Sequence, residues 1–579
     1  QEQVLTTIAI IADAAEKTFV KYYDTLMPLL VNVLRTDVGA ENKLLKAKCI
    51  ECSTLIALAV GKEKFAPHSQ ELIQLFGHIQ QSATEDDDLV KLYLEQAWGR
   101  ICKILGKDFL PYLPSVLPPL MLTAKASQDI SLLEEEDAEE LKLNEEWDVI
   151  NISGKWIGVH TVTLDEKVTA MDLLRTYAVQ LKEDFMPWVK EIAEEIAIPG
   201  LDFYLHDGVR GSAALTLASL LRCCVAATGN NSTEALTLWS KICNKLSELL
   251  CSEPVPELLI AYYTTLVESI NVLAPNAVSG TQLQALSKAV NANMIEIYNR
   301  IKERDNAEDE YTEDVEEDEE EYTDEELLDE INKVIAVVLK NVKSNFFETL
   351  QILGPTISSF INDENTTVKF CGLSIVSDIL EHCGPDSVPF KEMFVKVISE
   401  SVTSANASIR QICTNAIGMA AQYGGDGYAE FCLSLLEPMF KMAMVPDARA
   451  DENVYATENC VSAIAKVCHR FSSSVPNLDS LIDQWISLLP IVQDESAAPF
   501  AYMFLSELID RNHPSVLKQV PKVVESVLQA LAHASISGNT AQKVVISTRT
   551  LLGSIPHEEA VALLQKNPSD LDVVQKFFS

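Results

Sequence analysis

A phenylalanine, usually with a proline two residues later, recurs along the first third of the chain at nearly constant intervals. The motif reads EKTFVK at 16–21, GKEKFAP at 61–67, GKDFLP at 106–111 and KEDFMP at 182–187. Its successive phenylalanines lie 46, 44 and 76 residues apart, and the last interval is one period plus an insertion. A period in the forties predicts an array of helix pairs, in which each pair buries its apolar face only against its neighbours.

The recurring motif predicts a corner between two helices. Gly61 and Gly106 fall where a helix must end, because glycine accepts the left-handed conformation that follows the last turn. Pro67, Pro111 and Pro187 suit the first turn of the next helix, where a missing N–H is no loss. Each motif is therefore expected to mark the start of a new unit.

A second register supports the array. It comprises HDGVRGSAALTL at 206–217, ENTTVKFCGLSI at 364–375, NASIRQICTNAI at 406–417 and ENVYATENCVSA at 452–463. Each segment begins with polar residues, whose side-chain oxygens suit the exposed N–H groups of an incoming helix. We expect the second helix of a unit to begin at each of them.

Length and composition favour one continuous solenoid over 1–579. A chain of 579 residues, 47% of them hydrophobic, can bury an extensive core but exceeds one globular domain. The period predicts roughly 12 or 13 HEAT-type repeats in an all-α superhelix. The sequence shows no apolar run of the ~18 residues that span a bilayer, so membrane insertion is not expected. Because the first residues already resemble a second helix, we expect the carboxy-terminal part of a longer protein.

Two acidic segments interrupt the rhythm. Residues 128–162 begin with carboxylates and then alternate as WDVINISGKWIGVHTV, which predicts a short hairpin around Ser153 and Gly154. Residues 305–330 are expected to form a disordered loop, helical again from about Asp324, because 308–330 hold 16 carboxylates in 23 residues.

The charge of the chain indicates the kind of partner that it can bind. The formal net charge is −40, and removing the acidic loop still leaves about −23. DNA and RNA require a basic surface, so direct nucleic-acid binding is not expected. An acidic groove would instead attract lysine-rich segments and speed their encounter.

Cysteines and catalytic motifs give no sign of a metal or an active site. Cys49 and Cys52 form a CxxC pair, but they continue the apolar stripe of a helix from Leu45 to Ile56, which predicts packed thiols. We find no GxSxG, GxxxxGK[ST] or HExxH motif. The chain is therefore not expected to be an enzyme or to hold a cofactor or metal.

Six extended strings carry a family resemblance. They are LAVGKEKF at 58–65, CKILGKDFLPYLP at 102–114, FYLHDGVR at 203–210, MAAQYGGDGYAEFC at 419–432, ATENCVSAIAKV at 456–467 and SELIDRNHPSVL at 506–517. The chain resembles the importin-β superfamily, in particular its karyopherin-β3 branch, along nearly its whole length and with both acidic inserts in order. Members of this family are about twice as long, with the principal Ran-binding repeats at the amino end, which this segment would lack.

The resemblance implies a nuclear import receptor that shuttles between cytoplasm and nucleus. It implies three kinds of partner: basic nuclear localisation signals of cargo such as ribosomal proteins or histones, Ran-GTP, which releases cargo, and FG-nucleoporins in the pore. A monomer is expected. There are two alternatives. A HEAT scaffold such as a phosphatase subunit predicts repeats near 39 residues without long acidic inserts, unlike this chain. A histone chaperone would act through its acidic tract.

Cargo lysines would be held on the second helices, which line the concave face in this family. Polar residues beside the apolar stripe are the candidate contacts, where carboxylates hold the lysine and aromatic rings its stem. They are Glu51, Glu95, Trp98, Asp172, Glu458, Asn459 and Glu507. In the acidic loop the candidates are Glu308, Asp309, Glu316, Glu317, Asp318, Glu319, Glu320 and Glu321.

Overall fold

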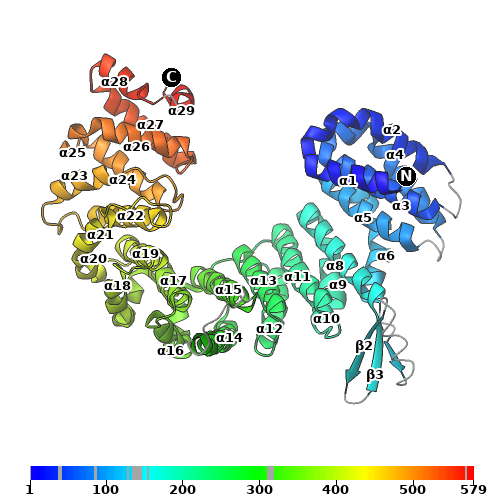
Figure 1. Ribbon diagram of the computed structural model, residues 1–579. Helices are drawn as coiled ribbons and strands as arrows, with labels where there is room; N and C mark the ends of the chain where they lie inside the picture. The colour runs from blue at the N-terminus through cyan, green and yellow to red at the C-terminus, as the bar shows by residue number, and fades with distance from the viewer. Residues whose placement is uncertain are drawn as a thin grey trace. The chain divides into compact units, whose positions relative to one another are not determined.

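The computed structural model consists of two compact units, Gln1–Ala277 and Val278–Ser579 (Figure 1). It describes residues 2–36, 42–83, 88–126, 130–133, 147–152, 155–308, 319–567 and 570–578. Each unit is an α-α solenoid of helix pairs, as the sequence period predicts.

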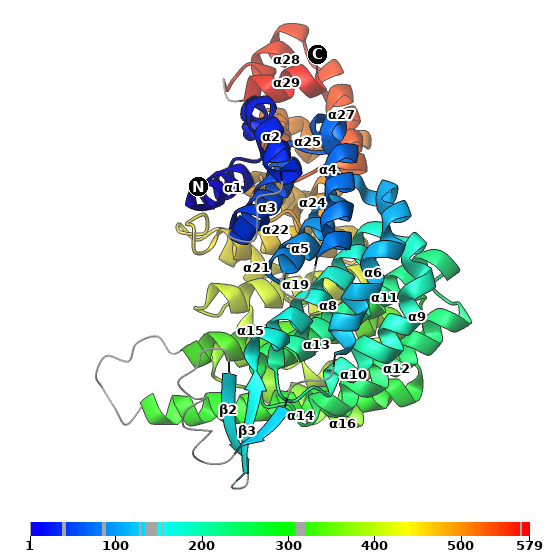
Figure 2. The same ribbon diagram turned by 90° about the vertical axis from the view of Figure 1, so that its right-hand side faces the viewer.

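In unit 1 a row of second helices packs side by side (Figure 2). The row is α1 (Glu2–Ala15), α3 (Lys43–Val60), α5 (Asp88–Leu105), α8 (Thr161–Leu181), α11 (Asp207–Thr228) and α13 (Pro256–Val272). The first helices cover one side of it, and they are α2 (Val20–Arg35), α4 (Lys62–Ser82), α6 (Leu113–Lys125), α9 (Met186–Ile192), α10 (Ile198–Leu201) and α12 (Thr233–Leu250).

Unit 2 repeats this arrangement. Its second helices are α15 (Glu319–Val342), α17 (Thr366–Cys383), α19 (Ala407–Tyr423), α22 (Val454–Arg470), α24 (Ala498–Asp510) and α27 (Gly538–Gly553). Its other helices are α14 (Gly280–Glu308), α16 (Leu350–Ile361), α18 (Val395–Ser401), α20 (Ala429–Ser434), α21 (Leu436–Ala443), α23 (Leu478–Leu488), α25 (Pro514–Lys518), α26 (Val520–Ala532), α28 (His557–Leu564) and α29 (Leu571–Phe577).

The phenylalanine corner has the same backbone geometry at four places, whereas at Gly61 the residue with positive φ lies four positions before Phe65 and α4 follows directly. A residue with positive φ stands three positions before a buried phenylalanine, and a 3-10 turn joins the two. The pairs are Glu16 and Phe19, Gly106 and Phe109, Lys182 and Phe185, and Lys343 and Phe346. Glycine is thus only one of the residues that fill the left-handed position, and the corners at Glu16 and Lys343 lack the proline that follows Phe109 and Phe185.

The prolines of the motif occupy different positions relative to the helix that follows. Pro187 lies in the first turn of α9, as predicted. Pro67 instead lies inside α4, because this helix already begins at Lys62, directly after Gly61. Pro111 lies in the 3-10 turn that precedes α6, so the first-turn prediction is wrong for both.

The caps of the second helices follow the predicted register with one exception. His206, Asn365 and Asn406 cap α11, α17 and α19, since their side chains accept hydrogen bonds from backbone N–H groups of the first turn. Asn453 precedes α22 but makes no such bond. Its side chain binds Arg410 and a backbone carbonyl instead.

A three-stranded antiparallel sheet connects α6 to α8 (Figure 1). It consists of β1 (Ile130–Leu133), β2 (Trp147–Ile152) and β3 (Lys155–His160), in the order β1-β3-β2. Strands β2 and β3 pair from Trp147 with His160 to Ile152 with Lys155. They flank Ser153 and Gly154, the expected hairpin turn, which lie outside the described residues.

Helices extend into the expected acidic loop from both sides. α14 continues to Glu308, so the loop expected from 305 is wrong at its start, and α15 begins at Glu319, five residues before the expected return to helix at about Asp324. The reason is visible at Asp324, which is 2% exposed and bonded to Arg300 and Arg304 of α14. This carboxylate is part of the fold rather than of a solvated linker.

Helix α11 is long and apolar enough to cross a membrane by composition alone. Of its most apolar window, 61% is buried within the protein, where α11 packs between α8 and α13. Its apolar composition therefore reflects its burial between α8 and α13.

Candidate functional site

Three of the predicted contact residues are structural. Trp98 is 4% exposed, packs against Phe76 and Phe109, and donates from Nε1 to Oε1 of Gln80 at 3.0 Å. It therefore belongs to the core. Periodicity places Trp98 beside Glu95 on the helix but does not reveal that the neighbouring helix α4 covers it.

Glu458 is fully buried and holds a loop together. Its carboxylate accepts hydrogen bonds from the backbone N–H groups of 492, 493 and 494, at 3.0, 2.8 and 2.8 Å. Arg449 supplies the countercharge at 3.2 Å. Asn459, 8% exposed, donates to Asp494 at 3.3 Å. These contacts correct the expectation that Glu458 and Asn459 face a peptide.

The other four predicted residues are partly buried, and three of them lie beside a basic side chain. Glu51 pairs with Lys48 at 2.9 Å, and Asp172 lies 3.4 Å from Arg175. Glu507 lies 3.2 Å from His469 and 3.5 Å from Arg511. Ion pairs that water can reach contribute little to stability.

Glu95 differs, because it faces a like charge. Burial and the nearby carboxylate of Glu166 raise the pKa of Glu95 to about 7, although Lys91 partly offsets them. A further cation beside Glu95 would favour its ionised form and lower its pKa again. This place in the second-helix row therefore suits a lysine ammonium.

Unit 2 has a second cluster of neighbouring carboxylates, on α17, which was not predicted from the sequence. Carboxylate oxygens of Asp378 and Glu381 and a ring nitrogen of His382 lie within 4.8 Å of one another. Burial and the charge of Glu381 raise the pKa of Asp378 to about 7. The i, i+3, i+4 spacing of these residues was the available sequence signal. The donor set can hold a divalent ion and equally an ammonium group.

The acidic-loop residues divide by what the structure describes. Glu308 ends α14, and Glu319, Glu320 and Glu321 form the first turn of α15. Asp309, Glu316, Glu317 and Asp318 lie outside the described residues, so their expected role stays a prediction.

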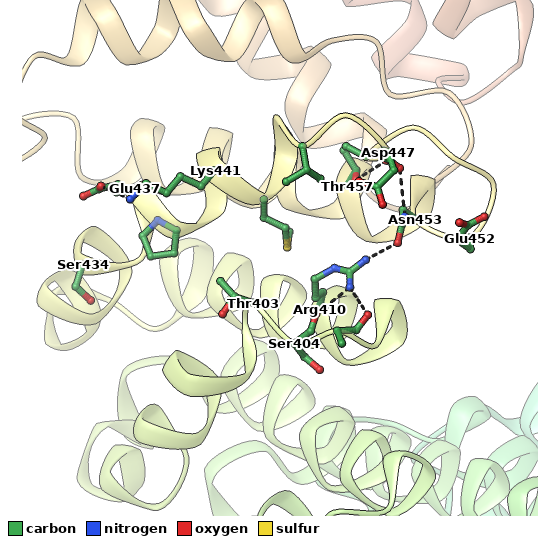
Figure 3. A pocket seen from close by; sticks show the side chains of 15 residues that line it. Thr403, Ser404, Arg410, Ser434, Glu437, Lys441, Asp447, Glu452, Asn453 and Thr457 are labelled. Carbon is green, nitrogen blue, oxygen red and sulfur yellow. Dashed lines mark hydrogen bonds and ion pairs between the residues drawn. The ribbon is translucent and has the colours of Figure 1, made fainter.

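The large pocket in Figure 3, of about 850 Å³, lies at the loops that precede α19 and α22. Arg410 points across it and donates to the carbonyls of Ser404 and Ala405, at 2.8 and 2.7 Å, and to the side chain of Asn453. Glu437 and Lys441 pair with each other on its rim. Because these polar groups bind one another, they hold the two loops together, and we do not select this pocket as the binding site.

The cysteines are free thiols, and all of them except the exposed Cys251 are buried. Cys49 and Cys52 are buried and free, and burial raises their pKa values to about 11 and about 12. Neutral thiols are poor metal ligands and nucleophiles.

Comparison with known proteins places this architecture in a family. Family models match residues 1–141 (Importin subunit beta-1-like, TPR repeats), 258–363 (Importin repeat 6) and 494–545 (Importin repeat). Importin subunit beta-3 of Saccharomyces cerevisiae is 44% identical over all of this chain and 53% of its own length. The chain spans about half the length of the curated relatives it matches.

Solved structures agree. Kap121p bound to RanGTP is similar with a TM-score of 0.85 and 41% identity, over 100% of this chain and 52% of that one. Kap121p bound to Pho4p is similar with a TM-score of 0.84 and 42% identity, over the same shares. The helical-repeat fold and the matching family models agree with the 44% identity over the whole of this chain. The chain belongs to the importin-β family.

Proposed function

We propose that this chain is part of a nuclear import receptor, and that its second helices bind lysine-rich signals of cargo proteins. The observation that carries the proposal is the pair of like-charge sites in the second-helix rows, Glu95 with Glu166 and Asp378 with Glu381. Burial and the neighbouring carboxylate raise the pKa of Glu95 and of Asp378 to about 7. A cargo lysine supplies positive charge that favours the ionised form of each.

Membership of the importin-β family supports the same function. Relatives are named importins, and similar chains have been solved with RanGTP and with Pho4p. By analogy we propose Ran-GTP, basic cargo and FG-nucleoporins as partners, with the receptor shuttling between cytoplasm and nucleus. Such receptors act by binding, and we propose no catalytic step.

The test is retention of a lysine-rich signal peptide by the 579-residue chain and by its full-length yeast relative, with and without Ran-GTP. We expect both proteins to retain the peptide, and Ran-GTP to release it from the relative. The control peptide has glutamine in place of every lysine. Equal retention of both peptides by the chain would contradict the proposal.

The chaperone alternative places binding in the acidic tract. Deleting 309–318 removes the tract between α14 and α15 and leaves Asp324 with its arginines in place. Loss of histone binding after this deletion would favour the chaperone, and retained binding of lysine-rich peptides would favour the second helices.

A further inference from the structure

A pocket on the second helices of unit 1 is lined mainly by basic side chains, although the chain as a whole is acidic. Its volume is about 280 Å³, and four successive second helices line it. Lys103 comes from α5, Arg175 from α8, Arg222 from α11 and Glu268 from α13. Three cations and one carboxylate thus meet in a chain whose formal net charge is −40.

The positive charge of this pocket is only partly neutralised. Arg222 pairs with Glu268 at 3.0 Å, and Arg175 lies 3.4 Å from Asp172 on its own helix. Lys103 is exposed and forms no ion pair with any residue that the structure describes. Exposed pairs of this kind are weak, so an incoming anion can compete for both arginines.

Neutral polar groups complete the lining. The side chains of Thr176 and Gln180 on α8 are half-buried and make no hydrogen bond within the described part of the chain. Both can donate to an oxygen atom. Guanidinium groups bind carboxylates and phosphates through two parallel hydrogen bonds, which lysine cannot match. The pocket therefore offers charge and geometry for an anionic oxygen group.

We propose that this pocket binds one acidic side chain, a carboxylate or a phosphoserine, of a partner peptide. Its size suits a single side chain, since pockets for drug-sized ligands begin at roughly 300 Å³. A nucleic acid would bring many phosphates toward an acidic protein, whereas a peptide brings one anion and can carry compensating lysines. The partner is therefore a peptide segment of mixed charge.

The distance between the carboxylate site at Glu95 and the anion pocket at Lys103 predicts how far apart the two charges of a bound peptide lie. Lys103 follows Glu95 by eight residues on α5, which is about 12 Å along a helix axis. An extended peptide covers that length in roughly four residues. The preferred segment thus carries a lysine and an acidic residue about four positions apart. Only this spacing rests on the proposed function, because the anion pocket stands without it.

The test is isothermal titration calorimetry with the whole 579-residue chain at low salt. Three short peptides in a glycine-serine background carry two glutamates, two phosphoserines or two glutamines, and none contains lysine. We expect both acidic peptides to bind at least fivefold more tightly than the glutamine peptide. Arg175→Gln with Arg222→Gln, and Lys103→Gln alone, should each remove that difference.

Lys241→Gln is the matched control, since Lys241 lies on α12 outside the pocket and forms a comparable exposed pair with Glu194 at 2.6 Å. It should leave the difference within twofold. Three results would overturn the proposal: equal binding of all three peptides, an equal loss in Lys241→Gln, or competition by inorganic phosphate as tight as the phosphoserine peptide. Glu95→Gln should leave these lysine-free peptides unaffected, which separates this test from that of lysine binding.

Discussion

At the scale of single residues, burial decides which carboxylates are available to a partner. Glu458 and Asp324 are buried and satisfied by arginines and by hydrogen bonds, so they hold the fold. Glu95 and Asp378 are less well satisfied, and the pKa of each rises to about 7. Composition alone cannot separate these two classes, since the burial of each carboxylate and most of its partners depend on other helices or on loops.

Replacing Glu458 should destabilise unit 2. Glu458→Gln removes the charge opposite Arg449 and turns an amide toward backbone N–H groups, which should cost about 2 to 4 kcal/mol. Amide hydrogen exchange in 487–497 should rise strongly, together with an earlier urea transition. Glu507→Gln, on an exposed carboxylate, should change stability by less than about 0.5 kcal/mol. Equal effects of the two substitutions would refute the structural role of Glu458.

Proton release should accompany lysine binding. The folded pKa of Glu95 is raised from 4.5 to about 7, so its contribution to stability is full below pH 4.5 and is lost as the pH rises to 7. A bound ammonium lowers that pKa again. At pH 7, titration of a lysine-rich peptide in buffers of different ionisation enthalpy should show proton release, and Glu95→Gln should reduce it by about half a proton. Unchanged release in Glu95→Gln would argue against this site.

At the scale of elements, the corner shows how far sequence reasoning reaches. The period and the buried phenylalanines could be predicted, because apolar burial and helix length leave a direct mark on sequence. The corners at Lys182 and Lys343 show the limit of sequence reasoning. A lysine occupies the left-handed position there, at a modest cost in free energy that packing offsets. Asn453 could not be recognised as an exception, because its partner Arg410 lies 43 residues away.

The corner glycine should matter for its conformation alone. Gly106 has φ +58°, and an added Cβ would meet no atom within 4 Å. Gly106→Ala should therefore cost about 1 kcal/mol, as strain without a clash. Lys182→Gly, at φ +52°, should change stability by less than about 0.5 kcal/mol, because relief of strain and added chain entropy offset each other. Urea unfolding with hydrogen exchange near each corner measures both, and the reverse order would contradict this account.

At the scale of the whole molecule, the family resemblance could be recognised from extended strings, whereas only part of the candidate site could be predicted. Glu95 was predicted from its place on a second helix. The cluster at Asp378 and Glu381 and the basic pocket were not predicted. Both depend on which side chains remain accessible to solvent after the helices pack. The net charge of −40 gives the average sign of the surface and conceals the local reversal at Lys103, Arg175 and Arg222.

The central claim is that carboxylates of the second helices, and not the acidic tract, bind lysine-rich segments. The measurement is the affinity of one lysine-rich peptide for four forms of the chain: unaltered, Glu95→Gln, Asp378→Asn with Glu381→Gln, and a deletion of 309–318. We predict a loss of at least fivefold for each carboxylate variant and less than twofold for the deletion. Affinity that collapses in the deletion and survives both carboxylate variants would contradict the account.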